Sequence, residues 1–249
     1  MLQISKRVSA LSPSATLAML QKTNELKAAG VDVIGLTAGE PDFNTPDHIK
    51  EAAKKAIDEN YSRYTPVSGY LSLRKAICDK LQRENGLTFT PDQIVVGNGA
   101  KHELANVVLT MVNPGDEVII PTPAWVSYVE LVKLAEGVPV CVPALPENGL
   151  KLTAEQLEAA ITPRTRLMIL CTPSNPTGAV YTAEELEALA AVLVKHPDVT
   201  VLSDEIYEHI NFTGGVASIS HCRGMQERVI ICNGVSKARC HKVSPIDRW

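Results

Sequence analysis

The sequence is poor in aromatic residues, and it lacks the features of several protein classes. Its 249 residues include only 3 Phe, 2 Trp and 6 Tyr, so an aromatic side chain near a polar motif is informative. No apolar run approaches the ~20 residues that span a bilayer, so we expect no membrane segment. The net charge of -4 leaves no basic surplus for nucleic acid or an anionic membrane. We see no signal peptide at the start and therefore expect a cytoplasmic location.

Cysteine is also scarce, and its pattern excludes the common metal and disulfide motifs. The six cysteines form no CxxC pair. Cys171 and Cys232 end apolar runs, where a reduced cysteine acts as a small hydrophobic residue. Two adjacent histidine–cysteine pairs, at 221–222 and 240–241, contain zinc-binding residue types, but adjacent ligands are poorly spaced around one tetrahedral ion. We therefore expect no metal site.

What the sequence does contain is an alternation of apolar runs and helical patterns. With 45% hydrophobic and 21% charged residues, the chain can bury a substantial core. We predict strands at 31–36, 94–96, 117–120, 138–142, 167–171, 199–202 and 229–232, and helices at 11–29, 46–60, 69–83, 101–111, 153–161 and 182–194. This alternation indicates an α/β fold, with a mostly parallel sheet that is flanked by helices on both faces.

Polar motifs follow several of the predicted strands. Lys237 lies in the loop beyond the strand at 229–232. A lysine at the rim of an α/β sheet is well placed to form a Schiff base, although one lysine alone is more simply interpreted as a solvated loop residue. Three further motifs, at 97–101, 174–178 and 203–208, follow apolar strands of their own. Because ligands bind beyond the carboxyl ends of parallel strands, the four together indicate a pyridoxal-phosphate pocket.

Each motif has a chemical and a structural interpretation. The glycines of 97–101 lead into a helix whose N-terminus suits a phosphate dianion, or they form an ordinary tight turn. Trp125 could stack on a flat heterocycle or fill the core. Asp204 could keep a pyridine nitrogen protonated or cap the following helix. Asn175 and Tyr207 could both donate hydrogen bonds to a phenolate oxygen on the same ring.

Taken together, the motifs resemble those of a known enzyme family. From about Ile4 to Lys237, the chain is similar to the N-terminal part of a class I aminotransferase of the bacterial aspartate aminotransferase type. The similar segments are SKRVSALSPSATLAM (5–19), LTAGEPDF (36–43), NPGDEVIIPTPAWVSY (113–128), SNPTGAVY (174–181), SDEIYEH (203–209) and NGVSK (233–237). Several such motifs in order are highly specific. The resemblance implies the α/β fold of the PLP-dependent transferases of fold type I.

The resemblance also implies a role for each site residue. Lys237 is the catalytic residue and links covalently to the cofactor, pyridoxal 5'-phosphate, while Asp204 pairs with the pyridine nitrogen. Asn175 and Tyr207 contact the phenolic oxygen, and Trp125 stacks on the ring. The residues around the phosphate are Gly99, Ala100, Lys101 and Ser236. The residues at the substrate are Gly39, Trp125 and Asn175.

Domains and partners follow from the same resemblance. Residues 1–42 correspond to an N-terminal arm and part of a small domain, and residues 43–237 to an incomplete PLP-binding large domain. Tyr64 matches the tyrosine that reaches the phosphate of the neighbouring subunit, so the active site would be shared across a homodimer. The other partners implied are small molecules, an amino acid and a 2-oxo acid.

The chain departs from the family after Lys237. The family continues with a segment like AxAMTGWRxG, whose arginine helps to bind the phosphate, whereas Pro245 stands at that position here. The family's C-terminal part, with the arginine that binds the substrate α-carboxylate, is absent. We interpret residues 238–249 as an aberrant tail, from a fragment or a shifted reading frame. We therefore expect the chain to be truncated and weakly active or inactive.

The function implied is transfer of an amino group between an L-amino acid, aspartate or a related one, and a 2-oxo acid. Two alternatives stay open. Another fold-type I PLP enzyme, such as a lyase, needs the same residues for its first half-reaction. A non-catalytic remnant would bind PLP weakly or only pair with a full-length subunit.

Overall fold

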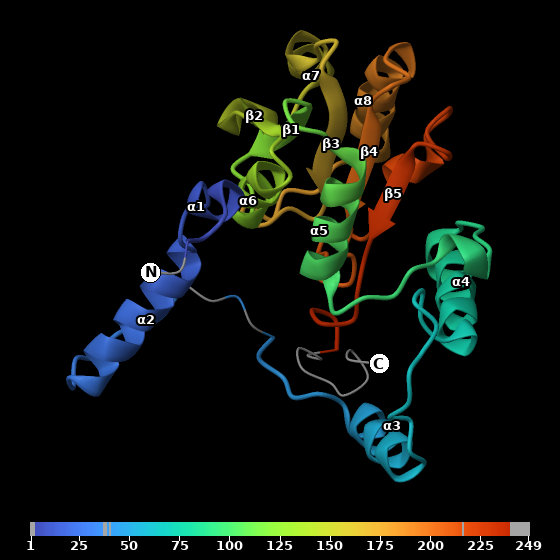
Figure 1. The fold of residues 1–249 in the computed structure, drawn as a ribbon. Coiled ribbons are helices and arrows are strands. Elements are labelled where there is room, and N and C mark those ends of the chain that lie inside the picture. The colour runs from blue at the N-terminus through green and yellow to red at the C-terminus, as the bar shows by residue number, and fades with distance from the viewer. Residues whose placement is uncertain (1–2, 37–38, 40, 216, 240–249) are drawn as a thin grey trace.

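A parallel sheet organises the chain, and the computed structural model describes residues 3–36, 39, 41–215 and 217–239 (Figure 1). Within these residues, five strands lie in the order β2-β1-β3-β4-β5, and every neighbouring pair is parallel. Their bounds are β1 Glu117–Thr122, β2 Val138–Pro143, β3 Thr165–Cys171, β4 Thr200–Asp204 and β5 Val229–Cys232. The parallel α/β sheet predicted from the sequence is confirmed.

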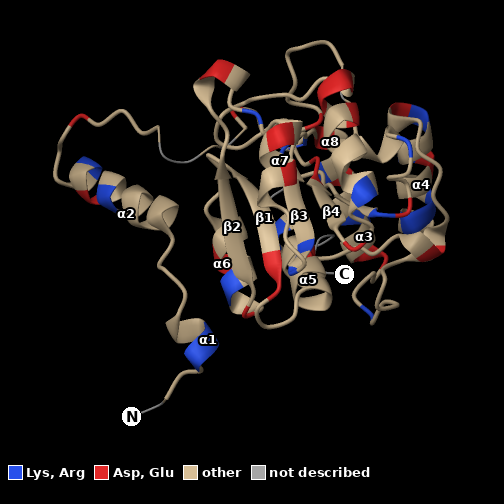
Figure 2. Ribbon diagram, turned by 90° about the horizontal axis from the view of Figure 1, so that it is seen from above, with Lys and Arg blue, Asp and Glu red and all other residues tan. Residues whose placement is uncertain are grey.

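Helices cover both faces of this sheet. Helices α5 and α6 pack on one face and helices α7 and α8 on the other, as the view from above shows (Figure 2). Their bounds are α5 Ala100–Met111, α6 Ser127–Leu134, α7 Ala154–Ala160 and α8 Ala183–Lys195. Successive strand residues point to opposite faces, so Val118 and Ile120 pack with α5 and α6, while Ile119 packs with α8. Because both faces are buried, the middle residues of β1, β3 and β4 form continuous apolar runs.

The ends of these helices follow the sequence signals. Thr153 and Thr182 form capping boxes, in which the threonine hydroxyl and the Gln156 or Glu185 side chain each accept a hydrogen bond from the other residue's backbone amide. Helix α5 begins differently, after Gly99. This glycine has a φ of 84° and offers no side-chain cap, so the first turn of α5 presents bare backbone amides.

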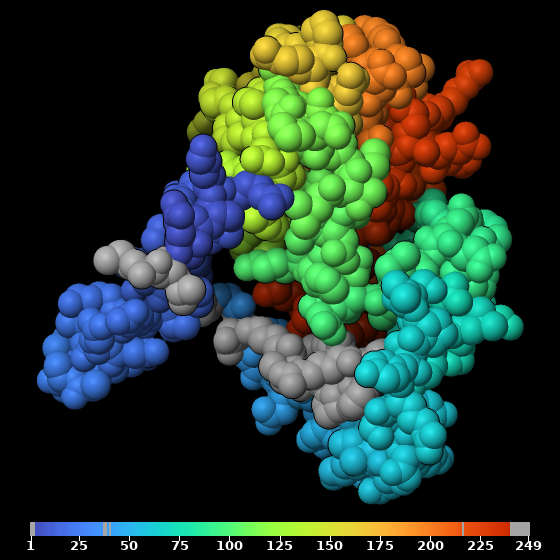
Figure 3. Space-filling view, viewed as in Figure 1, coloured from blue at the N-terminus to red at the C-terminus, as the bar shows by residue number. Residues whose placement is uncertain are grey.

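The remaining helices add little to the layered core, apart from η3 Ile219–His221, whose Ile219 packs into the cluster that includes α8. The others are α1 Lys6–Ser9, α2 Ala15–Ala28, α3 Asp47–Asp58, α4 Leu71–Asn85, and the short 3-10 helices η1 Pro91–Gln93 and η2 Pro146–Asn148. Helices α1, α2 and α3 bury no residue, and Figure 3 shows α2 and α3 projecting from the body. The Ser12 amide donates to Glu130 of α6 at 2.8 Å, which attaches the N-terminal segment to the core.

Two predicted strands are wrong. Residues 31–36 form no strand, and the side chains of Ile34 and Leu36 are 85% and 90% exposed. Residues 94–96 form no strand either, because the Val96 amide donates to a loop carbonyl instead of to a neighbouring strand. An apolar run without a partner strand has no hydrogen-bonded ladder to hold it extended.

Two helix predictions also need correction. The helix predicted at 11–29 begins at Ala15, because the Ser14 side chain accepts a hydrogen bond from the Leu17 amide and caps it there. The sequence did not predict α1 or α6, which are only 4 and 8 residues long. Prediction and structure agree to within a few residues at each end for α3, α4, α5, α7 and α8.

Some predictions fall outside the described residues. Residues 240–249 lie outside, including Pro245 and the histidine–cysteine pair at 240–241, as do 37, 38 and 40 of the motif at 36–43. No helix among the described residues is long and apolar enough to cross a membrane. The domain boundaries at residues 42 and 237 stay predictions.

Candidate active site

The carboxyl ends of neighbouring strands bring the predicted polar residues to one edge of the sheet. Asp204 is the last residue of β4, and it pairs in register with Cys171 of β3 and Cys232 of β5. Asn175 lies in the loop after β3, and Lys237 lies in the loop after β5. Residues that are far apart in the sequence therefore meet at this edge.

Asp204 is a buried carboxylate with a fixed orientation. It is 3% exposed, and its oxygens accept hydrogen bonds from the Tyr128 hydroxyl at 2.5 Å and the Ile206 amide at 3.2 Å. Burial raises the pKa of Asp204 above 3.8, against the opposing effects of these hydrogen bonds and of the nearby Lys237 ammonium. Burial also raises the pKa of Tyr128, so its hydroxyl stays protonated and donates to the carboxylate. A further cation beside Asp204 would stabilise its charge.

Asn175, Tyr207 and Lys237 form the second part of the site. The Asn175 Nδ2 donates to the Tyr207 hydroxyl oxygen at 3.1 Å. The Lys237 Nζ lies 5.5 Å from the centroid of the Tyr207 ring. Burial raises the pKa of Tyr207, so its hydroxyl keeps a proton that can be donated to an acceptor. An amide, a phenol and an amine thus lie together near the Asp204 carboxylate.

The N-terminus of α5 lies beside the end of β5. The Cys232 thiol contacts the Ala100 carbonyl oxygen at 3.5 Å, which joins the two elements. At Gly99, no atom lies within 4 Å of the position that a Cβ would occupy, so space is open at the first turn of the helix. The Lys101 Nζ lies 4.7 Å from the centroid of the Trp125 ring. Backbone amides and a cation are therefore available there for an anionic group.

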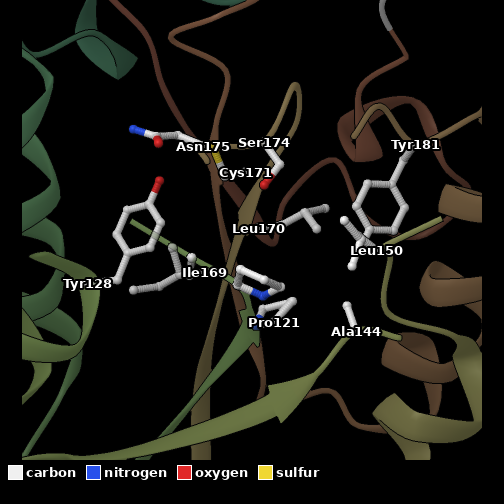
Figure 4. A pocket seen from close by; sticks show the side chains of 12 residues that line it. Pro121, Tyr128, Ala144, Leu150, Ile169, Leu170, Cys171, Ser174, Asn175 and Tyr181 are labelled. Carbon is white, nitrogen blue, oxygen red and sulfur yellow. The ribbon is translucent and has the colours of Figure 1, made fainter. Parts of the chain in front are cut away.

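A small cavity lies between the ends of β1 and β3, where the strand order reverses. Its volume is about 20 Å³, enough for one water molecule. Pro121 and Pro123 line it from the β1 side, and Figure 4 shows Tyr128 and Asn175 at one end with Tyr181 at the other. Ligands in parallel sheets bind at such reversal points. Since Tyr128 and Asn175 also contact residues of the Asp204 site, the cavity adjoins that site.

These residues fit the expected cofactor, pyridoxal 5'-phosphate. Asp204 would hold the pyridinium nitrogen, and Asn175 with Tyr207 would donate to the phenolic oxygen. The Lys237 amine would reach the aldehyde carbon. The first turn of α5 and the half-buried Ser236 would hold the phosphate. The deciding observation is Asp204, because a buried carboxylate with a raised pKa is short of positive charge, which a pyridinium supplies.

Gly39 and Tyr64 lie apart from this group. Both residues are exposed, and no atom lies within 4 Å of the position of a Cβ on Gly39. The expected substrate contact of Gly39 and the expected contact of Tyr64 with a neighbouring subunit therefore stay predictions.

The sequence did not identify Tyr128 and Cys171 as site residues. The Tyr128 ring meets the Trp125 ring edge-on, with 5.4 Å between centroids, and its hydroxyl orients Asp204. No local signal marks Tyr128, because its partner Asp204 lies 76 positions away in the sequence. Cys171 pairs in register with Asp204 and stays uncharged beside it, because burial raises the pKa of the Cys171 thiol to about 12.

Comparisons with known proteins identify the family to which the chain belongs. The family described as "Aminotransferase class I and II" matches residues 31–240. An aspartate/prephenate aminotransferase of Cereibacter sphaeroides is 54% identical over 241 residues, which are 95% of this chain and 60% of that protein. An aspartate aminotransferase of Pinus pinaster is 52% identical over 239 residues, which are 95% of this chain and 49% of that protein.

Solved structures show the same likeness. The aspartate aminotransferase of Rhizobium meliloti superposes with a TM-score of 0.94 at 45% identity, over 97% of this chain and 61% of that one. The Thermus thermophilus aspartate aminotransferase with maleate gives a TM-score of 0.91 at 47% identity, over 96% of this chain and 62% of that one. The chain thus spans about half to three-fifths of the length of the relatives that it matches.

Proposed function

Because the chain belongs to the class I and II aminotransferase family, we propose that it transfers an amino group between an L-amino acid and a 2-oxo acid, with pyridoxal 5'-phosphate as cofactor. The observation that carries this proposal is the convergence of four groups beyond neighbouring strands. They are the buried Asp204 carboxylate, the Asn175 amide, the Tyr207 hydroxyl and the Lys237 amine.

Each of the four groups has a task in this reaction. The cofactor supplies an electron-withdrawing ring that stabilises negative charge at the substrate Cα. Asp204 would keep the ring nitrogen protonated, and the Tyr128 hydroxyl holds Asp204 in place. Asn175 and Tyr207 would donate hydrogen bonds to the phenolic oxygen. The Lys237 amine would accept the proton from the substrate Cα and serve as its carrier.

Aspartate is the amino acid we propose as substrate. The names of the relatives support this choice, since the four cited above are aspartate or aspartate/prephenate aminotransferases. We also propose a cytoplasmic homodimer in which Tyr64 reaches the phosphate of the other subunit. The full exposure of Tyr64 in one chain supports this arrangement, because an unburied tyrosine is available to a second copy.

The test follows the products of the chain with pyridoxal phosphate, aspartate and 2-oxoglutarate. A transferase yields oxaloacetate and glutamate in equal amounts without ammonia, whereas a lyase releases ammonia. Because Pro245 replaces the family's phosphate-binding arginine, we expect turnover at least tenfold below that of a full-length relative. Aspartate alone should still convert the bound cofactor in a single half-reaction. If it releases no oxaloacetate and leaves the cofactor spectrum unchanged, the proposed function is wrong.

A further inference from the structure

The residues that follow β4 divide between two directions. Asp204 and Tyr207 contact residues of the candidate site, as described above. Glu205 and Glu208 alternate with them and contact other parts of the chain. Backbone hydrogen bonds from Glu208 to the Glu205 carbonyl and from Ile210 to the Tyr207 carbonyl close the segment into tight turns. A shift of either glutamate therefore also moves Asp204 and Tyr207.

Glu208 is held by helix α4. Its side chain is 6% exposed, Lys80 forms a close ion pair with it, and the Asn85 Nδ2 donates to it at 2.8 Å. Burial alone would raise the pKa of Glu208, but the hydrogen bonds from Lys80 and Asn85 bring that pKa below 4.5. Glu208 is therefore a buried, ionised anchor that depends on its partners in α4.

Glu205 is the second anchor. It is fully buried, and its Oε1 accepts hydrogen bonds from the Ser203 hydroxyl at 2.9 Å and the Ser218 hydroxyl at 2.6 Å. Its Oε2 has no hydrogen-bond partner among the described residues. Burial and the Glu208 charge raise the pKa of Glu205, and the Lys80 charge opposes them. Lys80 thus stabilises both carboxylates.

The α4 contact is polar and specific. Leu81 is the one buried residue of α4, while the Asn85 carbonyl oxygen accepts a hydrogen bond from His221 Nε2 at 2.7 Å. Glu84 and His209 also lie beside Glu208, and Lys80 pairs with both glutamates. These polar contacts join the C-terminal half of α4 to the segment that follows β4, next to the buried Leu81.

We infer that Lys80 is a positioning residue for the cofactor site: through Glu208 it holds the segment that carries Asp204 and Tyr207. This inference rests on the proposed function for the identity of the cofactor. A hydrogen bond from the Tyr207 hydroxyl to the phenolic oxygen tolerates only small displacements, because hydrogen bonds weaken steeply with distance and angle. Lys80 itself lies on a separate helix and touches neither Asp204 nor Tyr207 in any contact described above.

The test compares Lys80→Met with Lys75→Met, a matched substitution at an exposed lysine of the same helix. We expect Lys80→Met to weaken pyridoxal-phosphate binding on the order of tenfold and Lys75→Met to leave it unchanged. The absorbance of the bound cofactor changes with pH as it loses a proton. A poorly aligned Tyr207 hydrogen bond stabilises the phenolic oxygen's negative charge less, so the midpoint of this change should rise by roughly half a pH unit or more. A purely structural role would leave that midpoint unchanged.

Hydrogen exchange on the cofactor-free chain separates this inference from the proposed function. In Lys80→Met, amides of residues 204–210 should exchange at least tenfold faster, while those of β3 keep their wild-type rates. Lys80→Arg retains a cation and should restore most of the protection, which distinguishes a local effect from misfolding. If the wild-type chain binds no cofactor, the proposed function fails, but the exchange rates still decide the role of Lys80. Unchanged exchange, or altered exchange with unchanged cofactor affinity and midpoint, overturns the inference.

Discussion

Two buried carboxylates at opposite ends of the same parallel sheet, Glu117 and Asp204, have pKa values that are shifted in opposite directions. At the amino end, Glu117 begins β1 and accepts hydrogen bonds from the Thr162 hydroxyl at 2.5 Å and from Arg164 Nε at 2.9 Å. The Thr162 and Arg164 hydrogen bonds hold the pKa of Glu117 below 4.5. At the carboxyl end, burial outweighs the hydrogen bonds of Asp204 and Glu205 and raises the pKa of both.

The two carboxylates therefore have different consequences. Glu117 is satisfied within the chain, so its charge contributes to stability. Asp204 is oriented by Tyr128 and has a raised pKa, so a ligand cation beside it would stabilise its charge. Substitutions at the two ends of the sheet should therefore differ in what they change.

The largest effect should come from Lys237→Ala. Borohydride reduction of the wild-type chain with pyridoxal phosphate should place one pyridoxyl group on the peptide that contains Lys237. The variant should lose that label completely, because among the described residues Lys237 is the lysine whose amine lies over the Tyr207 ring. Peptide mapping by mass spectrometry is the measurement. A pyridoxyl group on Lys101 instead would show that the assignment is wrong.

Asp204→Asn should separate cofactor binding from stability at the carboxyl end. The amide keeps the shape of the side chain and can still bond Tyr128 and the Ile206 amide, but it cannot balance a pyridinium charge. We expect cofactor affinity to fall on the order of a hundredfold. The unfolding temperature of the cofactor-free chain should stay the same or rise, because a buried charge is removed. A lower unfolding temperature with unchanged affinity would make Asp204 a structural residue.

Glu117→Gln should lower the stability of the fold without changing cofactor affinity. The loss of charge-assisted hydrogen bonds from Thr162 and Arg164 should lower the free energy of unfolding by about 1–2 kcal/mol. Urea denaturation measures this, and the affinity for pyridoxal phosphate should not change. Glu158→Gln is the matched control, because the Glu158 ion pair with Lys195 is exposed and should contribute little. If Glu117→Gln and Glu158→Gln lower the free energy of unfolding equally, the buried hydrogen bonds of Glu117 contribute no more than an exposed ion pair.

The smallest effect concerns pH. Glu117 has a lowered pKa in the folded state, so its contribution is present above about pH 4.5 and is lost as pH falls through that lowered pKa. Asp204 has a raised pKa, so its contribution is present below pH 3.8 and is lost as pH rises through the folded-state value. Chemical denaturation of the cofactor-free chain at a series of pH values measures the free energy of unfolding. Glu117→Gln should reduce the loss of stability as pH falls, and Asp204→Asn should reduce the loss of stability as pH rises. If the curves of unfolding free energy against pH are parallel for the two variants, the opposite pKa shifts of Glu117 and Asp204 are contradicted.

The layered sheet and the principal site residues could be predicted because their signals are local. Each strand from β1 to β5 contains an apolar run, Asp204 ends β4, and Lys237 lies in the loop after β5. Tyr128 and Lys80 could not be predicted in this way. Their hydrogen bonds join residues 76 and 128 positions apart, and nothing near either residue in the sequence indicates its partner. The two false strands failed for the same reason, since a strand needs a neighbour that its own residues do not specify.

The register of β3, β4 and β5 makes cofactor binding a report on how the chain has folded. Asp204 faces the site only because it pairs with Cys171 and Cys232. A slip of one residue in β4 would turn Asp204 to the opposite face and bring Ser203 or Glu205 to its position. A slipped molecule could keep its secondary structure and yet bind no pyridoxal phosphate. The yellow colour of the bound cofactor would then mark the fraction of molecules whose strands are correctly aligned.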